Sequence, residues 1–506
     1  MNQRKFLENA ALLTGTGLLL RAAGLLLRVL VANVLGEEGM GLYSLTFTVY
    51  NLFITLAQSG IGIAVTRLVA QYLALKDERR VKGAMQACLL WAVLLGTLSA
   101  MGLFCLSGFL ASRWIGNVGC AFALRMLALS LPFMAVSGCF SGYFVGRRQV
   151  RPTCLAQTME QAVRLLICAL VVVLFRRAGT EILLGMIVLA NTLSEGVSCL
   201  FLACTCKRQR PLGTPISPPK GAIRRIALPV AASRYLSTAL HSTENMLIPL
   251  AIARHTGDYS VGLAQFGALK GMAIPLLFFP ASFLTALSSL LVPEVTDTAA
   301  RADWRATRVI VARALTVTVT LSVMISGIFF LYGDLLGRLL FHSPTVSMML
   351  KVLAPITPFM YMDTIADGLL KGLDRQGATL RNNTIDSVLR ILLIAVAVPL
   401  FGIRGFLGVM VFSNILVASL NIGTLLRACK LALQWKDWVL RPLCGVGLAT
   451  ALWACLPNRE TLLGLVTGGI LWCGVYLLLT LPVKKYIIKN RKDRRDPRER
   501  KAVKTF

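Results

Sequence analysis

The chain has 506 residues, of which 56% are hydrophobic and only 15% are charged, and its formal net charge is +30. No water-soluble core requires so large an apolar fraction, whereas each membrane-spanning helix requires about 20 mostly apolar residues. The composition therefore excludes an ordinary soluble protein and predicts an all-α polytopic membrane protein.

Fourteen apolar segments of spanning length follow one another along the chain. The first could be a signal peptide by its position, but Arg21 interrupts its apolar run and no small-residue cleavage site follows, so we keep it as a span. The fourteen spans are predicted near residues 11–35, 42–70, 85–112, 119–146, 154–175, 181–205, 224–253, 261–292, 308–332, 350–371, 383–401, 405–427, 438–457 and 461–482.

The positive charge suggests nucleic-acid binding, but its distribution argues against that function. Basic residues are concentrated in alternate loops, whereas the intervening loops carry few and one contains the acidic pair Glu37 and Glu38. This is the positive-inside pattern, which predicts that both termini lie in the cytoplasm; Arg176-Arg177, on a predicted outer loop, is an exception. We expect the basic tail at 484–506 to lie on anionic lipid rather than on nucleic acid.

The sequence contains no pattern that indicates catalysis. Its 13 cysteines form no C-x-x-C pair, and its three histidines form no ligand pattern. Nucleophile elbows, phosphate loops and dinucleotide fingerprints are absent from the sequence. We therefore expect a protein that is not an enzyme and that has no organic cofactor.

A long segment in the first half occurs again in the second half. Residues 125–166 align without a gap with residues 351–392, at an offset of 226 positions, and 11 of the 42 positions are identical. The matches include a Pro-Phe-Met triplet, two glycines, two threonines and an arginine, which similarity of composition does not explain. The segment is therefore a true internal repeat.

The repeat predicts the architecture. Its copies lie in spans four–five and ten–eleven, so the unit has six helices, and an even number keeps both copies in one orientation about an axis along the membrane normal. We expect two lobes around a central cleft suited to alternating access. The predicted parts are the N-lobe at 1–206, a Pro-rich cytoplasmic linker at 207–221, the C-lobe at 222–430, two further helices at 431–483 and the tail at 484–506.

Charged residues inside the spans indicate what lines the cleft, because each costs about 2.5–3.5 kcal/mol at mid-span unless it faces a partner or water. Arg21 and Arg28 fall on one face of the first helix. In the seventh span, the polar face that includes Arg234 and Glu244 could form an internal Arg-to-Glu network that holds helices together, instead of lining the cleft. The candidates for binding an anionic headgroup such as a diphosphate are Arg21, Arg28, Arg234, Lys270, Asn51 and Gln58.

The second lobe carries carboxylates that the first mostly lacks, since Ser137 of the first copy becomes Asp363 in the second. With nearby amides such a set could bind Na⁺ or carry a proton. The alternative is simple pairing at i,i+4 spacing. That alternative applies to Asp367 with Lys371, Asp386 with Arg390 and Glu160 with Arg164. The cation-coupling candidates from this reasoning are Asp363, Glu244, Asp386 and Asn383.

Several motifs resemble a known family. These are Arg21-x-x-Gly24, VLGEEGMGLY at 34–43, AVTRLVA at 64–70, GYFVGR at 142–147 and the stretch 267–294, which ends in LVPE. They are similar to the stage V sporulation protein B family, in the oligosaccharide-flippase branch of the multidrug/oligosaccharidyl-lipid/polysaccharide exporter superfamily. The resemblance covers essentially the whole chain.

The resemblance implies transport of an undecaprenyl-diphosphate-linked sugar, such as a lipid II-like precursor for spore-cortex peptidoglycan, across the bacterial plasma membrane. It also implies that first-helix arginines and a cation on the eighth helix hold the diphosphate. Arg21 matches that pattern, Arg28 is one residue out of register, and Lys270 stands where arginine is usual. Some relatives use a sodium site on the seventh, eleventh and twelfth helices, for which the resemblance offers Glu244, Asn383, Asp386 and Asn414.

We therefore expect a lipid-linked oligosaccharide flippase that works by rocking of its two lobes. One alternative is a cation-coupled drug or metabolite exporter of the same superfamily. Another is a non-transporting scaffold for envelope-synthesis proteins, in which the cleft charges would pair internally. An intramembrane glycosyltransferase is disfavoured because the predicted outer loops are short.

Overall fold

The computed structural model describes residues 3–58, 60–175, 177–208, 221–454 and 462–480, and the single positions 214, 216 and 218. Most of the predicted linker at 207–221 and the whole tail at 484–506 lie outside these residues. In the described part every regular element is helical, and nine helices are long and apolar enough to cross a membrane. The predicted all-α polytopic class is confirmed.

The first half of the chain forms seven α-helices and one short π-helix, η1. Their bounds are α1 Gln3–Gln58, α2 Ile61–Ala74, α3 Glu78–Leu110, η1 Ala111–Ile115, α4 Cys120–Ala128, α5 Leu131–Gly146, α6 Arg151–Phe175 and α7 Thr180–Arg208.

The second half begins with α8 and ends with two helices outside the repeat. The bounds are α8 Ala222–Thr256, α9 Tyr259–Phe266, the π-helix η2 Gly267–Ala273, α10 Ile274–Phe278, α11 Ala281–Ala300, α12 Trp304–Phe341, α13 Pro344–Leu353, the 3₁₀ turn η3 Ala354–Ile356, α14 Thr357–Gly372, α15 Gln376–Cys429, the π-helix η4 Lys436–Leu440, α16 Arg441–Ala454 and α17 Leu462–Thr480.

Two of the long helices each consist of two helical halves joined at a glycine. α1 turns at Gly36, where φ is 70°, and α15 turns at Gly402, where φ is 60°. Only glycine adopts this left-handed conformation without a steric penalty, so each residue reverses the chain between two helical halves. The turn at Gly36 lies between the predicted spans 11–35 and 42–70, and the turn at Gly402 lies between the predicted spans 383–401 and 405–427. Each of the fourteen predicted spans overlaps a helix.

The packing of the glycines shows that the repeat extends beyond the aligned segment. Gly142 packs on the Gly62 carbonyl and Gly146 on the Thr66 carbonyl; at the offset of 226, Gly368 packs on Ser288 and Gly372 on the Val292 carbonyl. These pairs join α5 to α2 in one half and α14 to α11 in the other. These glycines are therefore helix-packing surfaces.

The loops repeat in the same way. Asp77 and Asp303, which are 226 positions apart, each cap a helix by accepting a hydrogen bond from the backbone three residues on. Lys76 and Ala302, the residues before these caps, both have a φ of 56°. The two halves therefore share their turns as well as their helices.

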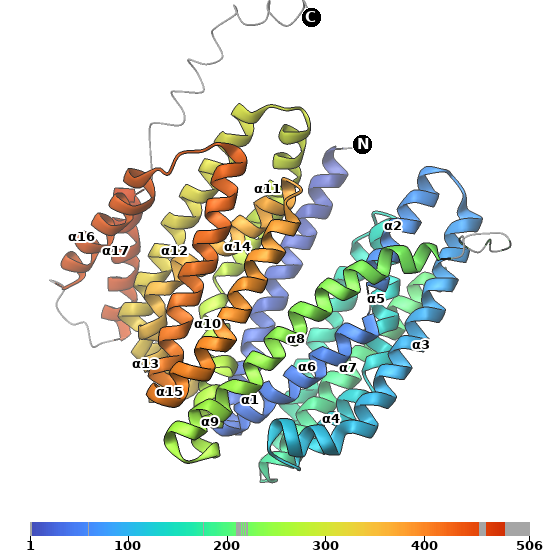
Figure 1. Cartoon of the computed structure of the whole chain (residues 1–506), viewed down its shortest axis with the longest axis horizontal. Helices are drawn as coiled ribbons and strands as arrows, with labels where there is room; N and C mark the ends of the chain where they lie inside the picture. Colours follow the sequence, from blue (N-terminus) through green and yellow to red (C-terminus); the bar gives the residue numbers. More distant parts are fainter. Residues whose placement is uncertain are drawn as a thin grey trace, which may run out of the picture.

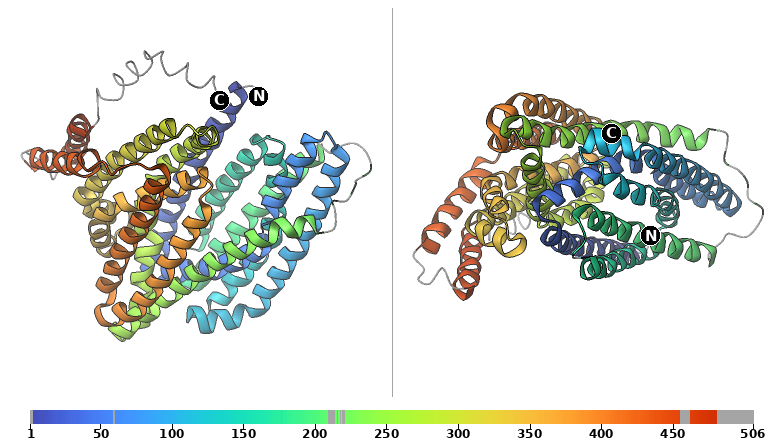
Figure 2. Two further views of the ribbon diagram at one scale, coloured as in Figure 1. Left: turned by 45° about the horizontal axis from the view of Figure 1, so that its top comes forward. Right: turned by 90° about the horizontal axis from the view of Figure 1, so that it is seen from below.

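The helices form two groups that lie closest at one end of the molecule (Figure 1). Helices α2–α7 form one group and α9–α15 the other, while α8 crosses between them and α16 and α17 lie outside α12 (Figures 1 and 2). At the end opposite the N-terminus, Asn33 Nδ2 donates to the Leu340 carbonyl (3.0 Å) and Ser343 Oγ to Glu37 Oε1 (2.5 Å). Tyr259 there donates to the Ile115 carbonyl (2.6 Å). Hydrogen bonds thus join the lobes at this end.

Candidate functional site

A cavity of about 470 Å³ lies between α1, the helices of the N-lobe and the start of the C-lobe. Pockets of roughly 300–1,000 Å³ are typical of small-molecule sites. Its described lining residues are Gly24, Leu27, Arg28, Tyr43, Ser44, Phe47, Thr48, Asn51, Gln161, Arg164, Cys168, Ile187, Asn191, Asn245, Phe266 and Lys270.

The cavity wall is cationic. Three of the described lining residues are basic, four carry a carboxamide, and none is a carboxylate. The basic residues are Arg28 from α1, Arg164 from α6 and Lys270 from η2, so both lobes contribute positive charge. Guanidinium and ammonium groups beside amides form charge-assisted hydrogen bonds with phosphate oxygens, and amides match sugar hydroxyls.

Arg28 differs from the other two cations in its partners. It is half-buried and makes no ion pair with any carboxylate in the described part of the chain. An intramembrane arginine in this state should face water or a ligand rather than lipid. Its charge is therefore available to a bound anion.

Lys270 projects from η2, which packs tightly on the second half of α1. A Cβ atom on Gly267 would overlap the Glu37 carbonyl and the Gly41 backbone, and one on Gly271 would lie 2.8 Å from Met40. Two glycines flanking Lys270 thus allow η2 to approach α1 closely. The Lys270 side chain is 21% exposed and its Nζ donates to Glu244 Oε1 (3.1 Å).

Lys270 is the first member of a series of ion pairs that extends through Glu244 and Arg390 to Asp386 in the C-lobe. Glu244, on α8, is buried with its side chain only 2% exposed, and its Oε2 lies 3.3 Å from Arg390 Nη1. Arg390 also pairs with Asp386, and its Nε donates to Ser413 Oγ (2.8 Å). Ser413 in turn donates to Asp386 Oδ1 (2.5 Å).

At the offset of 226, the N-lobe repeats the Arg390–Asp386 pair as Arg164 and Glu160, whereas its serine and second carboxylate, Ser194 and Glu195, come from α7. Arg164 Nη2 donates to Glu160 Oε1 (2.6 Å), and its Nε donates to Ser194 Oγ (3.2 Å). Glu195 lies 3.9 Å from the same guanidinium and accepts from Asn191 Nδ2 (3.0 Å). Each lobe thus holds a buried arginine between two carboxylates.

The predicted i,i+4 ion pairs are all present. Besides Arg164–Glu160 and Arg390–Asp386, Lys371 Nζ lies 2.5 Å from Asp367. The alternative of simple pairing is confirmed for these three acids. For Asp386, however, the arginine it pairs with also contacts Glu244 on another helix.

The structure brings together three of the six headgroup candidates, since Arg28, Lys270 and Asn51 all line the cavity. Arg21 lies outside its lining; it is exposed, and its Nη1 donates to Ser282 Oγ of α11 (3.4 Å). Gln58 and Arg234 are also outside the lining.

The cation-coupling candidates do not form one cluster. Asp363 accepts from Asn421 Nδ2 (2.7 Å), and Asn421 also contacts Asn383 (3.4 Å). Asn414 donates to the carbonyl of Met410 on its own helix (2.7 Å). Glu244 and Asp386 both pair with Arg390. Among the described residues no group of three or more His, Cys, Asp or Glu has an arrangement that could hold a metal ion.

Four residues of the site escaped the sequence reasoning: Gln161, Arg164, Asn191 and Glu195. Arg164 was recognised as an ion-pair partner of Glu160 but not as part of the cavity wall. Glu195, four residues after Asn191 in the sixth span, could have been found by testing every intramembrane acid against an i,i+4 partner.

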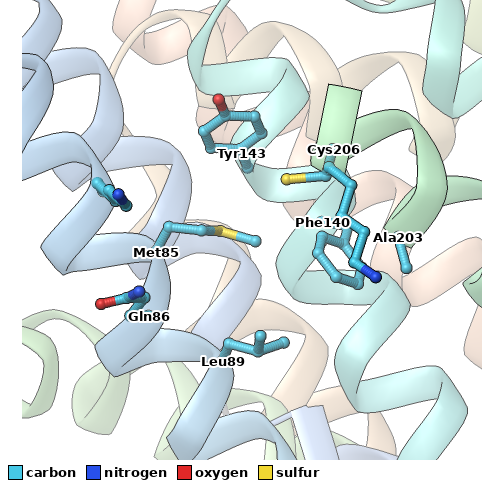
Figure 3. Close-up of a pocket in the computed structure, with 9 residues that line it drawn as sticks. Met85, Gln86, Leu89, Phe140, Tyr143, Ala203 and Cys206 are labelled. Atoms are coloured by element: carbon cyan, nitrogen blue, oxygen red, sulfur yellow. The ribbon is translucent and has the colours of Figure 1, made fainter. Parts of the chain in front are cut away.

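A second, smaller cavity of about 220 Å³ lies within the N-lobe (Figure 3). Met85 and Leu89 of α3 face Phe140 and Tyr143 of α5 across it, with Cys206 of α7 alongside. Its lining is mostly apolar, and its basic residues are the two lysines Lys82 and Lys207. This cavity does not combine cations from both lobes and does not match a diphosphate-linked sugar.

The arrangement of two helical lobes is similar to that of solved structures of MOP-superfamily transporters. An inward-facing multidrug resistance MATE family transporter of that superfamily has a TM-score of 0.68 at 16% identity, covering 81% of this chain and 94% of that chain. At this identity the likeness shows the fold alone.

Sequence comparison gives the family. Residues 6–287 match the model for polysaccharide biosynthesis proteins, which is more than half of the chain, so the chain belongs to the polysaccharide biosynthesis protein family. It is 25% identical to stage V sporulation protein B of Bacillus subtilis over 451 residues, which is 87% of each protein. It is also 24% identical to the lipid II flippase MurJ of the same organism over 170 residues, 32% of this chain and 31% of that protein.

Proposed function

We propose that this protein is a flippase that moves a lipid-linked oligosaccharide, of the peptidoglycan-precursor class, across the bacterial plasma membrane. The observation that carries the proposal is the cavity in which Arg28, Arg164 and Lys270 converge with four carboxamides and no described carboxylate. A diphosphate joined to a sugar supplies the matching groups: phosphate oxygens for the cations and hydroxyls for the amides. The named relatives, a sporulation protein and a lipid II flippase, agree with this substrate class.

The geometry favours a rocking mechanism. The lobes are joined by hydrogen bonds at the end opposite the N-terminus, and the positive-inside pattern assigns the N-terminal end to the cytoplasm. The cavity would then receive its substrate from the cytoplasmic side, and separation of the outer contacts would expose it to the other side. The protein acts in this scheme as a transporter rather than an enzyme, with its basic tail on anionic lipid and envelope-synthesis proteins as further partners.

A cationic drug exporter is the less favoured function for a specific reason. Such a substrate is best matched by an acidic contact surface, whereas the charged residues among the described lining of the cavity are all basic. The cavity would repel a cation.

The test is translocation of lipid II in proteoliposomes by the wild-type protein, Arg28→Ala and Lys270→Ala. Hydrogen bonds to charged groups contribute about 1.5–3 kcal/mol, so each variant should lower transport about tenfold to a hundredfold. Arg301→Ala is the matched control, because Arg301 is 74% exposed and pairs only at the surface with Asp297. Failure of the wild-type protein to move lipid II, together with movement of a cationic drug, would reject the proposed substrate.

A further inference from the structure

The sodium site implied by the resemblance can be compared with the oxygens that the C-lobe offers. Sodium, like other hard cations, requires several free carboxylate, carbonyl or amide oxygens around one point. Glu244 instead accepts from Lys270 Nζ through Oε1, at 3.1 Å, and contacts Arg390 through Oε2, at 3.3 Å. Both oxygens of its carboxylate are already occupied by cations.

The other offered carboxylate is engaged as well. Asp386 pairs with Arg390 through Oδ2 and accepts from Ser413 through Oδ1, at 2.5 Å. The two remaining ligands are neutral amides: Asn414 donates through Nδ2 to its own helix, and Asn383 Oδ1 accepts from Asn421 Nδ2 at 3.4 Å. The residues present therefore do not fit a bound sodium ion.

The charge balance gives a second, independent reason. Lys270 and Arg390 carry two positive charges, and Glu244 and Asp386 carry two negative ones, so the group is neutral. All four side chains are at most 21% exposed. A sodium ion would leave a net positive charge in a poorly hydrated part of the lobe, which is strongly unfavourable.

We propose that the guanidinium of Arg390 is the resident cation of the C-lobe, occupying the place between α8 and α15 that Na⁺ would otherwise fill. The group formed by Lys270, Glu244, Arg390 and Asp386 is then independent of sodium. The N-lobe offers a parallel, since Arg164, at the position equivalent to Arg390, pairs with Glu160 and also lies near a second carboxylate, Glu195 of α7. The Arg390 guanidinium is covalently attached and is never released to either side of the membrane. An ion gradient therefore cannot drive transport by binding and release of a cation at this group.

The test measures the melting temperature of the purified full chain in detergent, over a roughly hundredfold range of NaCl, with KCl holding total salt constant. The wild-type protein and the charge-conserving Arg390→Lys should show no response specific to sodium. Arg390→Met removes the guanidinium at similar volume and leaves one net negative charge. Its melting temperature should start lower and rise with NaCl by about 2 °C or more.

A double variant separates sodium binding from a general salt effect. Glu244→Gln with Arg390→Met restores neutrality, so it should lose the sodium response. The proposal is overturned if the wild-type protein itself shows a sodium-specific rise that Glu244→Gln or Asp386→Asn abolishes. It is also overturned if Arg390→Met folds and does not respond to sodium. If Arg390→Met does not fold, the wild-type measurement still decides. This readout involves no substrate, so it is independent of the proposed transport function.

Discussion

Arg21 and Arg28 lie on the same face of α1 two turns apart, yet they have different surroundings. Arg28 lines the cavity without an ion-pair partner among the described residues, while Arg21 is exposed and contacts Ser282. Helical spacing could identify the shared face, but it could not show which turn lies level with Lys270 and Arg164. The level of each turn depends on the position of α1 along the neighbouring helices, which is set by tertiary packing and not by helical spacing.

This difference predicts a ranking of the two arginines. Arg21→Ala should reduce lipid II translocation less than Arg28→Ala, because only Arg28 is within the group of converging cations. Initial transport rates in proteoliposomes with matched protein content measure the ranking. An equal or larger loss for Arg21→Ala would indicate that the headgroup binds nearer the N-terminal end of the cleft.

Arg164 has a structural role as well as a position in the cavity wall. Its guanidinium pairs with Glu160 and lies near Glu195, whose side chain is 6% exposed. Removing one partner of a buried ion pair costs about 3–5 kcal/mol, because the remaining charge stays buried. Arg164→Met should therefore lower the melting temperature clearly, and adding Glu195→Gln should restore part of the loss. If the double variant is no more stable than the single one, Glu195 is not the group that Arg164 neutralises.

At the level of elements, the close contact between η2 and α1 decides where Lys270 lies. Gly267 has no room for a side chain because the Glu37 carbonyl and the Gly41 backbone fill the space. The sequence placed Lys270 between two glycines, but it gave no reason to expect a π-helix there. A π-helix inserts one extra residue per turn, which changes the direction of every side chain after it.

The close contact of Gly267 with α1 predicts that one added methyl group destabilises the protein. Gly267→Ala forces η2 away from α1, and overpacking of this kind costs about 1–3 kcal/mol, so the melting temperature should fall and transport should weaken through the shift of Lys270. Gly423→Ala is the control, because nothing lies within 4 Å of its added methyl group and alanine favours a helix. A Gly267→Ala variant as stable as Gly423→Ala would contradict this packing.

The helices themselves could largely be predicted from the sequence, and their ends could not. Each of the fourteen predicted spans overlaps a helix, and the glycines at 36 and 402 mark the turns inside α1 and α15. α12, however, has 38 residues against 25 in the predicted span, because its ends are mixed in polarity and give no hydrophobic signal. α8 is not among the nine apolar helices of the described part, since its polar face lowers its mean hydropathy.

At the scale of the whole molecule, the two lobes must separate at one end if they rock. The contact between Glu37 of the N-lobe and Ser343 of the C-lobe, at 2.5 Å, lies at the end that is closed here. Glu37→Cys combined with Ser343→Cys, with exposed native cysteines replaced by serine, should form a disulfide that stops transport. Reduction should restore it, and each single variant should keep its activity under oxidation. Full transport by the cross-linked protein would exclude opening at this end.

The close contact of η2 with α1 also joins equivalent residues of the two repeats. Gly41 and Gly267, whose backbones meet, are separated by 226 positions, the offset of the repeat. A residue that touches its own copy lies on the pseudo-twofold axis, so this contact has the form of an isologous dimer interface. Three positions further on, the equivalent residues differ: Ser44 in the first copy and Lys270 in the second, so a symmetric contact carries an asymmetric charge.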